Sequence, residues 1–340
     1  MIIVDELKNR ALILNSRPDG YPDESNFKLI EIDIPELNPG EFIVKILWLS
    51  VDPYMRGRMS DKKSYAPSVE IGDVMVGGAV GKIISSRNTE FEVGDLVEGR
   101  FGWQEYAISN GMNARKLTIN ESDISKALGA LGMPGLTAYF GLFSLGRPIP
   151  NDTVVISAAS GAVGAVVGQL AKLSGCKVVG IVGSDPKAMY IKNELNFDYV
   201  INYKKEDVCK RLLEICPNGI DIYFDNVGGE ILEAVLENLA FRARIVVCGQ
   251  IAQYNLANDE VAHGITNFRN ILTNQATVEG FIVSRFASDF PQAYSFLERL
   301  YTDGKLKTKE DIIINLENTP EALLRVLTGK NFGKQIVQIV

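Results

Sequence analysis

The sequence predicts an α/β protein in which a doubly wound parallel sheet is joined to a second, β-rich domain. Three observations point to this class. Strand and helix patterns alternate over residues 153–302, which is typical of βαβ units. The region before them carries short strand patterns separated by turns. The alternating region opens with a Val/Ile-rich strand, a small-residue turn and the start of a helix.

The β-rich region is expected to cover residues 1–126. Its expected strands are 11–14, 42–47, 76–84 and 103–107. Turn-forming pairs, such as Pro39 with Gly40, separate these strands. A helical pattern follows over residues 128–143, and Pro134 with the glycine after it is expected to interrupt this helix.

The alternating pattern assigns residues 127–304 to a nucleotide-binding domain. The expected strands are 153–157, 177–182, 198–201, 220–224, 243–248 and 277–283. The expected helices are 162–174, 186–195, 205–215, 229–239 and 289–302. Such alternation implies right-handed crossovers and a parallel sheet with helices on both faces. Six strands match the arrangement of two mononucleotide-binding halves in a Rossmann fold.

The last segment, residues 305–340, changes character again. It contains a strand pattern at 311–314, a helix at 320–327 and an apolar run at 333–340. We expect the final run to rejoin the N-terminal β domain.

Composition excludes several classes of function. Apolar residues make up 46% of the chain and charged residues 23%, which is the range of globular proteins. The net charge of −7, with no Lys/Arg-rich run, argues against a nucleic-acid partner and against an anionic membrane surface. No apolar run approaches about 18 residues, and the first ten residues carry four charges, so neither a membrane span nor a signal peptide is expected. Cytoplasm is the expected location.

Metal-ligating residues are scarce. The chain has four cysteines and one histidine, His263, and their spacing fits no zinc site. A metal-free mechanism is therefore expected, with reduced and mostly buried thiols. His263 lies in a polar stretch with no partner evident in the sequence, so we interpret it as a surface residue rather than an acid catalyst.

The small-residue turn after the strand at 153–157 predicts a pyrophosphate site. Such a turn needs one small residue to tighten it, one to let the backbone approach the ligand, and one to let helix and strand pack closely. These places fall on Ala159, Gly161 and Gly164. Alanine at the first place departs from the usual glycine. The pyrophosphate would lie at the positive end of the following helix.

The choice between NAD and NADP depends on the end of the next strand. Asp185 could bind a ribose 2′-hydroxyl, as in NAD enzymes, but it is followed by proline and reads more simply as the cap of a helix. Gly183 then lies at the strand end, and Ser184, Lys187 and Tyr203 could instead contact a 2′-phosphate. We therefore favour NADP. The alternative for Lys187 is a solvated helix residue. Residues 225–229 and 248–250 also follow strands, where they form either ligand contacts or ordinary turns.

Five blocks of sequence resemble a known family across nearly the whole chain. They are residues 51–56, 102–106, 131–139, 157–168 and 223–229. In this order they resemble the zinc-independent medium-chain dehydrogenases/reductases, in the branch of leukotriene hydroxydehydrogenases, prostaglandin reductases, plant alkenal double-bond reductases and curcumin reductases. The resemblance implies a GroES-like catalytic domain, split between residues 1–126 and 305–340, around a Rossmann domain. It also implies NADPH as reductant and a homodimer joined along the last strand of the Rossmann sheet.

The resemblance assigns roles to individual residues. Tyr254 matches a tyrosine implicated in catalysis, or it caps the pocket, and it also lies beside the cofactor. Tyr54 forms a wall for the substrate, or it packs on Pro53. Residues 255–275 form the loop that covers the substrate. The implied cofactor contacts are Met133, Thr137, Gly161, Ala162, Val163, Gly164, Gly183, Ser184, Lys187, Tyr203, Asn226, Cys248, Tyr254, Phe281, Ile282, Val283 and Asn331.

The resulting hypothesis is conjugate reduction of a small-molecule enal or enone, with hydride transferred from NADPH to the β-carbon. An NADPH-dependent quinone reductase is the nearest alternative. A non-catalytic NADPH-binding sensor or structural protein is an alternative of another class. A methyltransferase also uses a glycine-rich first turn, but the β-rich first domain and the sixth strand argue against it.

Overall fold

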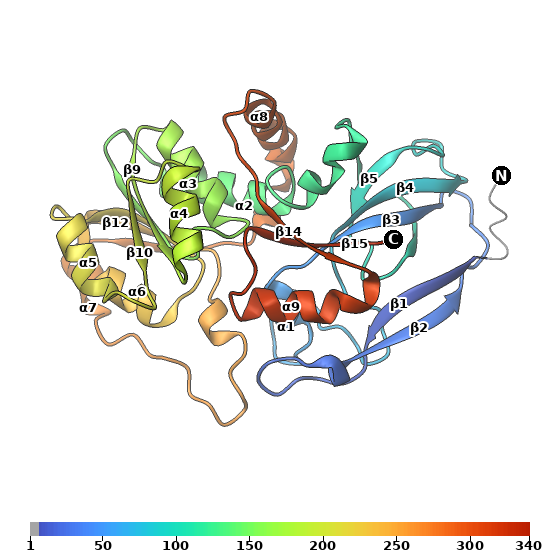
Figure 1. Cartoon of the computed structure of the whole chain (residues 1–340), viewed down its shortest axis with the longest axis horizontal. Helices are drawn as coiled ribbons and strands as arrows, with labels where there is room; N and C mark the ends of the chain where they lie inside the picture. The colour runs from blue at the N-terminus through green and yellow to red at the C-terminus, as the bar shows by residue number, and fades with distance from the viewer. Residues whose placement is uncertain (1–6) are drawn as a thin grey trace. The chain divides into compact units, whose positions relative to one another are not determined.

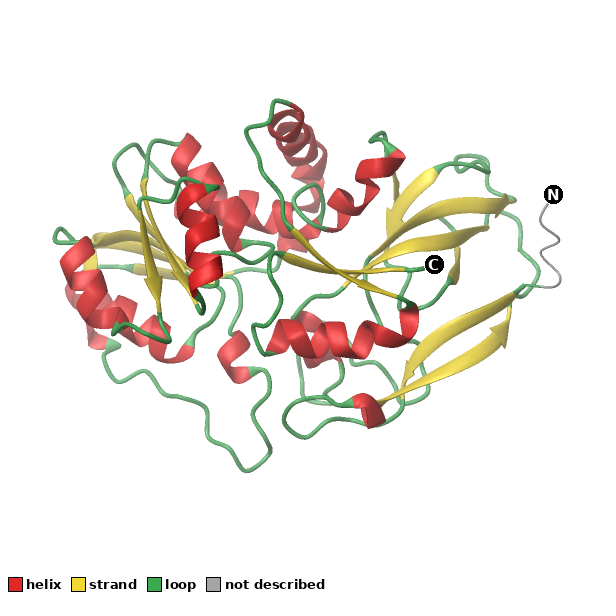
Figure 2. Ribbon diagram, viewed as in Figure 1, coloured by secondary structure: helices red, strands yellow, loops and turns green. Residues whose placement is uncertain are grey.

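The computed structural model describes residues 7–340, which fall into two compact units. One unit, which we call the split unit, joins the chain up to Leu128 with Glu310–Val340. The other, the Rossmann unit, is Gly129–Lys309. The sequence placed these boundaries after residues 126 and 304. Figures 1 and 2 show the helices and strands of each unit.

The split unit is built on β-strands. A hairpin pairs β1 with β2, and a larger sheet has the order β14-β15-β3-β4-β5-β7, with β6 also paired to β3. The bounds are β1 Lys8–Leu14, β2 Phe27–Asp33, β3 Phe42–Ser50, β4 Ala79–Ser86, β5 Leu96–Gly99, β6 Tyr106–Ser109, β7 Ala114–Lys116, β14 Glu310–Ile314 and β15 Lys334–Gln338. Strand β15 runs antiparallel to β3, with Val337 opposite Leu49, so the end of the chain returns to the N-terminal sheet.

Short helices complete the split unit. They are η2 (Glu24–Asn26), α1 (Tyr54–Arg58), η3 (Glu121–Leu128), η7 (Leu316–Asn318) and α9 (Thr319–Leu327). One part of the core joins the two chain segments, because Ile336 of β15 packs with Val80 of β4 and Leu128 of η3. The strand expected at 103–107 is wrong in its first half: Trp103 is fully buried beside Gly77, and β6 begins only at Tyr106.

The Rossmann unit contains a six-stranded sheet in the order β10-β9-β8-β11-β12-β13, and every pairing is parallel. Its strands are β8 Thr153–Ile156, β9 Lys177–Val182, β10 Tyr199–Asn202, β11 Ile220–Asp225, β12 Leu239–Val247 and β13 Thr277–Gly280. The order reverses between β8 and β11, which is where such sheets bind ligands. The predicted doubly wound six-stranded sheet is confirmed.

Helices lie on both faces of this sheet. The helices of the unit are α2 Met133–Phe140, the π-helix η4 Gly141–Gly146, α3 Gly164–Leu173, α4 Asp185–Asn193, α5 Val208–Ile215, α6 Gly229–Leu236, η5 Ile251–Gln253, α7 Arg269–Thr273, η6 Val283–Asp289 and α8 Phe290–Thr302. Neighbouring residues of β11 show the two faces. Tyr223 packs with Leu212 of α5 and Leu236 of α6, whereas the Phe224 ring lies against Gly141 of η4.

Three expected boundaries are corrected. Pro134 does not interrupt a helix but lies in the first turn of α2, where its missing N–H is not needed. The helix expected from 205 begins at Val208, because the Asp207 carboxylate accepts from the Lys210 amide at 3.0 Å and caps it. The last strand ends at Gly280, and Val283 already belongs to η6.

Among residues 7–340, no single helix is long and apolar enough to span a bilayer. Helix η3 together with α2 and η4 has the length and composition of a span, but the pair is bent by 51°.

Candidate functional site

The predicted pyrophosphate turn lies between β8 and α3. Its backbone closes by a hydrogen bond from the Gly161 amide to the Ala158 carbonyl at 2.9 Å. A Cβ added to Gly161 would meet only that carbonyl, at 3.2 Å, so the fold itself leaves this backbone open to a ligand. A Cβ on Gly164 would lie 2.6 Å from the same oxygen, so this glycine is needed by the turn. The two glycines therefore have separate tasks, as the motif predicts.

The alanine at the first place of the motif has a structural explanation. Ala159 is fully buried, and its amide donates to the Ile181 carbonyl of β9 at 3.1 Å. A Cβ added to Gly180, on the same strand, would lie 2.9 Å from the Ala159 methyl group. The bare Gly180 thus provides the room that a glycine at position 159 would otherwise supply.

The turn after β9 contains or contacts four of the predicted cofactor residues, namely Gly183, Ser184, Lys187 and Tyr203. Ser184 is the N-cap of α4, and Lys187 lies in the first turn of that helix. The Ser184 hydroxyl makes no capping bond. A Cβ on Gly183 would lie 2.8 Å from the Tyr203 ring, so the half-exposed ring covers this glycine. The predicted proximity of these residues is therefore present at the end of the second strand.

Asp185 is not the N-cap that the sequence suggested, because Ser184 takes that place and Asp185 is the first helical residue. Its carboxylate has two partners. The side-chain amide of Asn202 donates to Oδ1 at 2.8 Å, and the ammonium group of Lys205 pairs with Oδ2. The hydrogen bond from Lys205, and to a smaller extent that from Asn202, holds the pKa of Asp185 below its ordinary value. Asp185 is therefore charged at neutral pH.

A buried polar network joins the pyrophosphate turn to the end of β11. The Asn226 side-chain amide donates to the Ser157 carbonyl at 2.8 Å, and its backbone amide donates to the Ser157 hydroxyl at 2.8 Å. The Asp225 oxygen Oδ1 accepts from the Tyr223 hydroxyl at 2.9 Å and from the Gly228 amide at 2.8 Å. These bonds fix the direction in which Asn226 leaves the strand.

Asp225 is fully buried, and burial raises its pKa, although the Gly228 and Val227 amides counteract this shift. Within residues 7–340 its second oxygen, Oδ2, has no hydrogen-bond partner. The neighbouring Cys248 amide donates to the Asp225 carbonyl at 2.8 Å. Burial, and then the charge of Asp225, raises the pKa of the Cys248 thiol to about 12.

Tyr254 lies at the end of η5, but its hydroxyl returns to the end of β12. The Gln250 amide donates to this hydroxyl at 3.3 Å, and a Cβ on Gly249 would lie 3.2 Å from it. Gly249 also approaches the Asn226 carbonyl, so Tyr254 and Asn226 flank the same strand end. Burial raises the pKa of Tyr254, and the Gln250 amide counteracts the shift only in part. The phenol therefore keeps its proton at neutral pH and can donate it.

Other predicted cofactor residues lie on α2 and after β13. The Thr137 hydroxyl donates to the Met133 carbonyl at 2.7 Å, so it can only accept from a ligand. Phe281 is buried, and its ring tip approaches Gly141, whereas Ile282 is exposed. Val283 begins η6. Phe281 therefore supports the sheet end, and Ile282 is the member of this segment that offers apolar surface.

Two predicted residues, Tyr54 and Asn331, belong to the split unit. Tyr54 is the first residue of α1; burial raises the pKa of its phenol, as does the charge of Asp52. The side chain of Asn331 donates to the Gly333 carbonyl at 2.9 Å, within the loop between α9 and β15. This bond shapes the loop.

The segment 255–275, expected to be a loop, contains α7 at Arg269–Thr273 and is held against α6 mainly by Glu233, with Glu237 at the end of α6 accepting from the Asn267 side chain at 2.6 Å. Glu233 pairs with His263 at 2.6 Å and accepts from the Thr266 amide at 2.9 Å, and the Thr266 hydroxyl binds the same carboxylate. Thr266, and then His263, lower the pKa of Glu233 to about 2. His263 thus has a partner, which the sequence did not reveal because 30 residues separate the two.

Metal donors do not gather anywhere in the described part of the chain: no three His, Cys, Asp or Glu side chains are placed to hold one ion. All four cysteines are free. Cys176 and Cys216 are buried, whereas Cys209 and Cys248 are only partly so, which corrects the expectation of mostly buried thiols.

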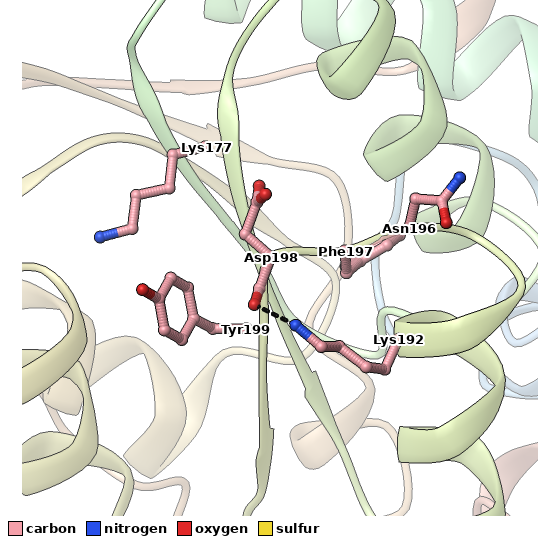
Figure 3. Close-up of a pocket in the computed structure, with 6 residues that line it drawn as sticks. All are labelled: Lys177, Lys192, Asn196, Phe197, Asp198 and Tyr199. Carbon is pink, nitrogen blue, oxygen red and sulfur yellow. Dashed lines mark hydrogen bonds between the residues drawn. The ribbon is translucent and has the colours of Figure 1, made fainter.

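An open depression of about 670 Å³ lies at the amino ends of the strands, beside the first residues of β9 and β10 (Figure 3). The ammonium groups of Lys177 and Lys192 lie 4.9 and 5.8 Å from the centre of the Tyr199 ring. Its lining residues are Lys177, Lys192, Asn196, Phe197, Asp198 and Tyr199. None of the predicted site residues is among them. The depression is therefore separate from the candidate site at the carboxyl ends of the strands.

Sequence reasoning missed three contributors to the site. Asn202 and Lys205 looked like ordinary residues after a strand, and only the β9–β10 pairing brings them to Asp185. Gln250 acts through its backbone amide, which leaves no signal in a side-chain pattern. One signal was present in the sequence: Asn202 directly follows the strand expected at 198–201, which could have indicated a partner for Asp185.

Comparison with known proteins gives consistent results. Residues 10–117 match the family model described as the N-terminal domain of oxidoreductase, and residues 162–299 match the one described as zinc-binding dehydrogenase. The NADPH-dependent curcumin reductase of Escherichia coli is 40% identical, over 98% of this chain and 97% of that protein. The NADP-dependent 2-alkenal reductase of Nicotiana tabacum is 40% identical over 99% of each chain. The crystal structure of CurA from Vibrio vulnificus in complex with NADPH aligns with a TM-score of 0.92 and 43% identity, over 97% of this chain and 99% of that one.

Proposed function

Because this chain belongs to the zinc-independent medium-chain dehydrogenase/reductase family, we propose that it reduces the carbon–carbon double bond of α,β-unsaturated aldehydes and ketones. Its cofactor is NADPH. The observation that carries the proposal is the position of the Tyr254 hydroxyl. It lies at the end of β12 beside Gly249 and retains its proton, in the same unit as the pyrophosphate turn.

The residues of the Rossmann unit fit this cofactor. Gly161 leaves the turn open on the side away from Ala158. No side chain caps the amino end of α3, so the positive end of this helix is available to a pyrophosphate. Ser184, Lys187 and Tyr203 would hold the 2′-phosphate, and Asn226, Cys248 and Ile282 would lie beside the ribose and nicotinamide. When bound, NADPH supplies the hydride.

The protein's own contribution to the reaction is orientation and charge stabilisation. As the β-carbon is reduced, negative charge develops on the carbonyl oxygen of the substrate. The Tyr254 hydroxyl would donate a hydrogen bond to this oxygen. In a site that excludes water, such an interaction is worth about 3 kcal/mol. The ribose 2′-hydroxyl is the other candidate donor. The α-carbon then takes a proton from Tyr254 or from water. Tyr54 is proposed as an aromatic wall for the substrate.

The proposal is tested by the products of a substrate panel. Purified protein is mixed with NADPH and, in parallel, with a medium-chain 2-alkenal, the matching enone, its saturated analogue and a quinone. We expect NADPH to be oxidised with the enal and with the enone, and mass spectrometry to detect the saturated carbonyl products. The saturated analogue should cause no NADPH oxidation. Turnover of the quinone alone would instead identify a quinone reductase. Tight NADPH binding without turnover of any compound would identify a sensor.

A homodimer joined through the Rossmann unit is also proposed. Strand β13 ends the sheet, so its outer edge has no partner within the described residues of this chain. Val278 of this strand leaves 45% of its surface exposed, which suits an interface. Light scattering of wild type and Val278→Asp tests this: a dimer that the substitution disrupts supports it, and a monomeric wild type refutes it. A cytoplasmic location is proposed as well, and the four free cysteines support a reducing compartment.

A further inference from the structure

The turn between β9 and α4 holds an acidic residue where acidity ordinarily favours NADH. In dinucleotide-binding sheets, a carboxylate after the second strand binds the ribose 2′-hydroxyl and repels a 2′-phosphate. Asp185 occupies this region, three residues beyond Val182, the last residue of β9. Lys205 and Asn202 hold its pKa low, so it is ionised at neutral pH. Because the cofactor is NADPH, another group has to offset this charge.

The segment after β10 provides the offsetting group. Strands β9 and β10 are parallel, with Val182 opposite Asn202, so both strands end side by side. The Tyr203 amide extends this pairing with a 3.0 Å bond to the Val182 carbonyl. The chain then turns, and Lys205 reaches the Asp185 oxygen Oδ2. One short segment therefore brings Tyr203 onto Gly183 and Lys205 onto Asp185.

Asn202 controls the direction of the carboxylate. Only 6% of its surface is exposed, and both ends of its side-chain amide are used. Its nitrogen donates to the Asp185 oxygen Oδ1 at 2.8 Å, and its oxygen accepts from the Lys204 amide at 3.2 Å. The amide cannot be reversed without breaking both bonds. Asp185 is thus held by a fixed donor on one oxygen and by a cation on the other.

We propose that Lys205 is a specificity-determining residue for NADPH because it neutralises Asp185, and that Asn202 is a positioning residue that turns this carboxylate toward Lys205. The inference rests on the proposed location of the 2′-phosphate beside Ser184, Lys187 and Tyr203. In that location a phosphate carrying about two negative charges would be repelled by an unpaired Asp185. The role of Lys205 is distinct from that of a phosphate ligand, since its ammonium group is already paired with a carboxylate.

The test measures dissociation constants for NADPH and NADH by quenching of protein fluorescence or by calorimetry, without substrate. The variants are Lys205→Met, Asp185→Asn and the double variant. Lys192→Met is the matched control, because it removes the same charge from the last turn of α4. We expect Lys205→Met to weaken NADPH binding by about fivefold at low salt, with NADH binding changed by less than about twofold. Adding Asp185→Asn to Lys205→Met restores NADPH binding. The control leaves the ratio of the NADPH and NADH affinities unchanged.

Two further results bear on the inference. Since Lys205 and Asp185 are exposed, the fivefold loss is expected to shrink as salt is raised toward 1 M. Asn202→Ala is expected to lower the NADPH/NADH ratio in the same direction, and Asp185→Asn is expected to cancel that effect too. A loss that persists in the Lys205→Met/Asp185→Asn double variant overturns the inference, because Lys205 would then bind the phosphate directly. An equal loss for NADH and NADPH also overturns it.

The same measurements separate this inference from the proposed phosphate site. Tyr203→Ala and Lys187→Met test the site itself, and each is expected to lower the NADPH/NADH ratio. If these two variants change the ratio but Lys205→Met does not, the neutralising role alone is refuted. If none of the three changes it, the phosphate lies elsewhere, and the proposed site fails together with the inference.

Discussion

The ammonium nitrogen of Lys334 lies 2.6 Å from the Asp52 oxygen Oδ1, although 282 residues separate the two in sequence. Both side chains are more than nine-tenths buried. Lys334 also donates to the Val51 carbonyl at 2.9 Å, and the Ser50 hydroxyl binds the other oxygen of Asp52. The pair fastens the start of β15 to the segment that leads from β3 into α1. The pair therefore fixes the start of α1, whose first residue is Tyr54.

Removal of one member of this pair is expected to destabilise the split unit strongly. Lys334→Met leaves the Asp52 carboxylate buried without its cation, which typically costs about 3–5 kcal/mol. The Lys334→Met/Asp52→Asn double variant removes both charges and is expected to lie closer to wild type. Both tryptophans, Trp48 and Trp103, belong to the split unit, so tryptophan fluorescence during urea unfolding reports its stability. A single variant as stable as wild type would contradict this interpretation of the pair.

The two glycines on either side of the α3 start are expected to respond differently to alanine. Gly161→Ala adds a methyl group that meets only the Ala158 carbonyl at 3.2 Å, so stability should change by less than about 1 kcal/mol while NADPH binding weakens by about tenfold or more. Gly168→Ala places its methyl group 1.9 Å from the Phe197 ring, so it should destabilise the unit by about 1–3 kcal/mol. Thermal unfolding with and without NADPH, beside NADPH titration, checks both. A stable Gly161→Ala with wild-type NADPH affinity would argue against a pyrophosphate at this turn.

The Rossmann sheet could be predicted from sequence because its signals are local. Strands β8, β9 and β11 are mostly apolar runs bounded by turns, and their observed bounds lie within one residue of those expected. The split unit was harder to predict. Its sheet depends on pairing between distant segments, as between β15 and β3. Trp103 looks like a strand residue, but it lies before β6, where its buried ring stacks on Phe27. Pro134 was misread because the proline rule has opposite meanings inside a helix and at its start.

The candidate site was predictable where a motif carries it and not where tertiary pairing does. Gly161 and Gly164 follow from the strand–turn–helix pattern. The Asn202–Asp185 bond and the Glu233–His263 pair join residues 17 and 30 positions apart, and no periodicity in the chain indicates either one. The Tyr254 hydroxyl reaches the β12 end through a 3₁₀ turn, which propensity alone does not predict.

Tyr254→Phe is expected to slow turnover far more than it weakens NADPH binding. The substitution removes only the hydroxyl group, and loss of a hydrogen bond to a developing oxyanion commonly costs about 100-fold in kcat. The NADPH dissociation constant should change by less than about threefold, since the ring remains. Tyr254 acts as a donor only while it is protonated. Because burial raises the pKa of this phenol, wild-type kcat should begin to fall only at a pH above the ordinary pKa of tyrosine. Rapid mixing of a preformed NADPH complex with an enal separates chemistry from binding, and unchanged turnover would remove Tyr254 from the mechanism.

The Cys248 thiol is expected to resist the electrophiles that the proposed reaction consumes. Enals alkylate thiolates, and a thiol whose pKa is raised to about 12 by burial and by the charge of Asp225 carries very little thiolate at pH 7. Incubation of the native protein with a short enal, followed by peptide mass spectrometry, should therefore leave Cys248 unmodified. In urea the thiols regain ordinary pKa values, so all four cysteines should react.

The control for this protection is Asp225→Asn. Asn keeps an oxygen for the Gly228 and Val227 amides, so the turn should be retained, but the negative charge near Cys248 is lost. Because that charge raises the pKa of the thiol, its removal should lower the pKa and speed alkylation of Cys248, while burial still keeps the rate below that of free glutathione. Alkylation of wild-type Cys248 as fast as glutathione would show that neither burial nor Asp225 protects it. An unchanged rate in Asp225→Asn would assign the protection to burial alone.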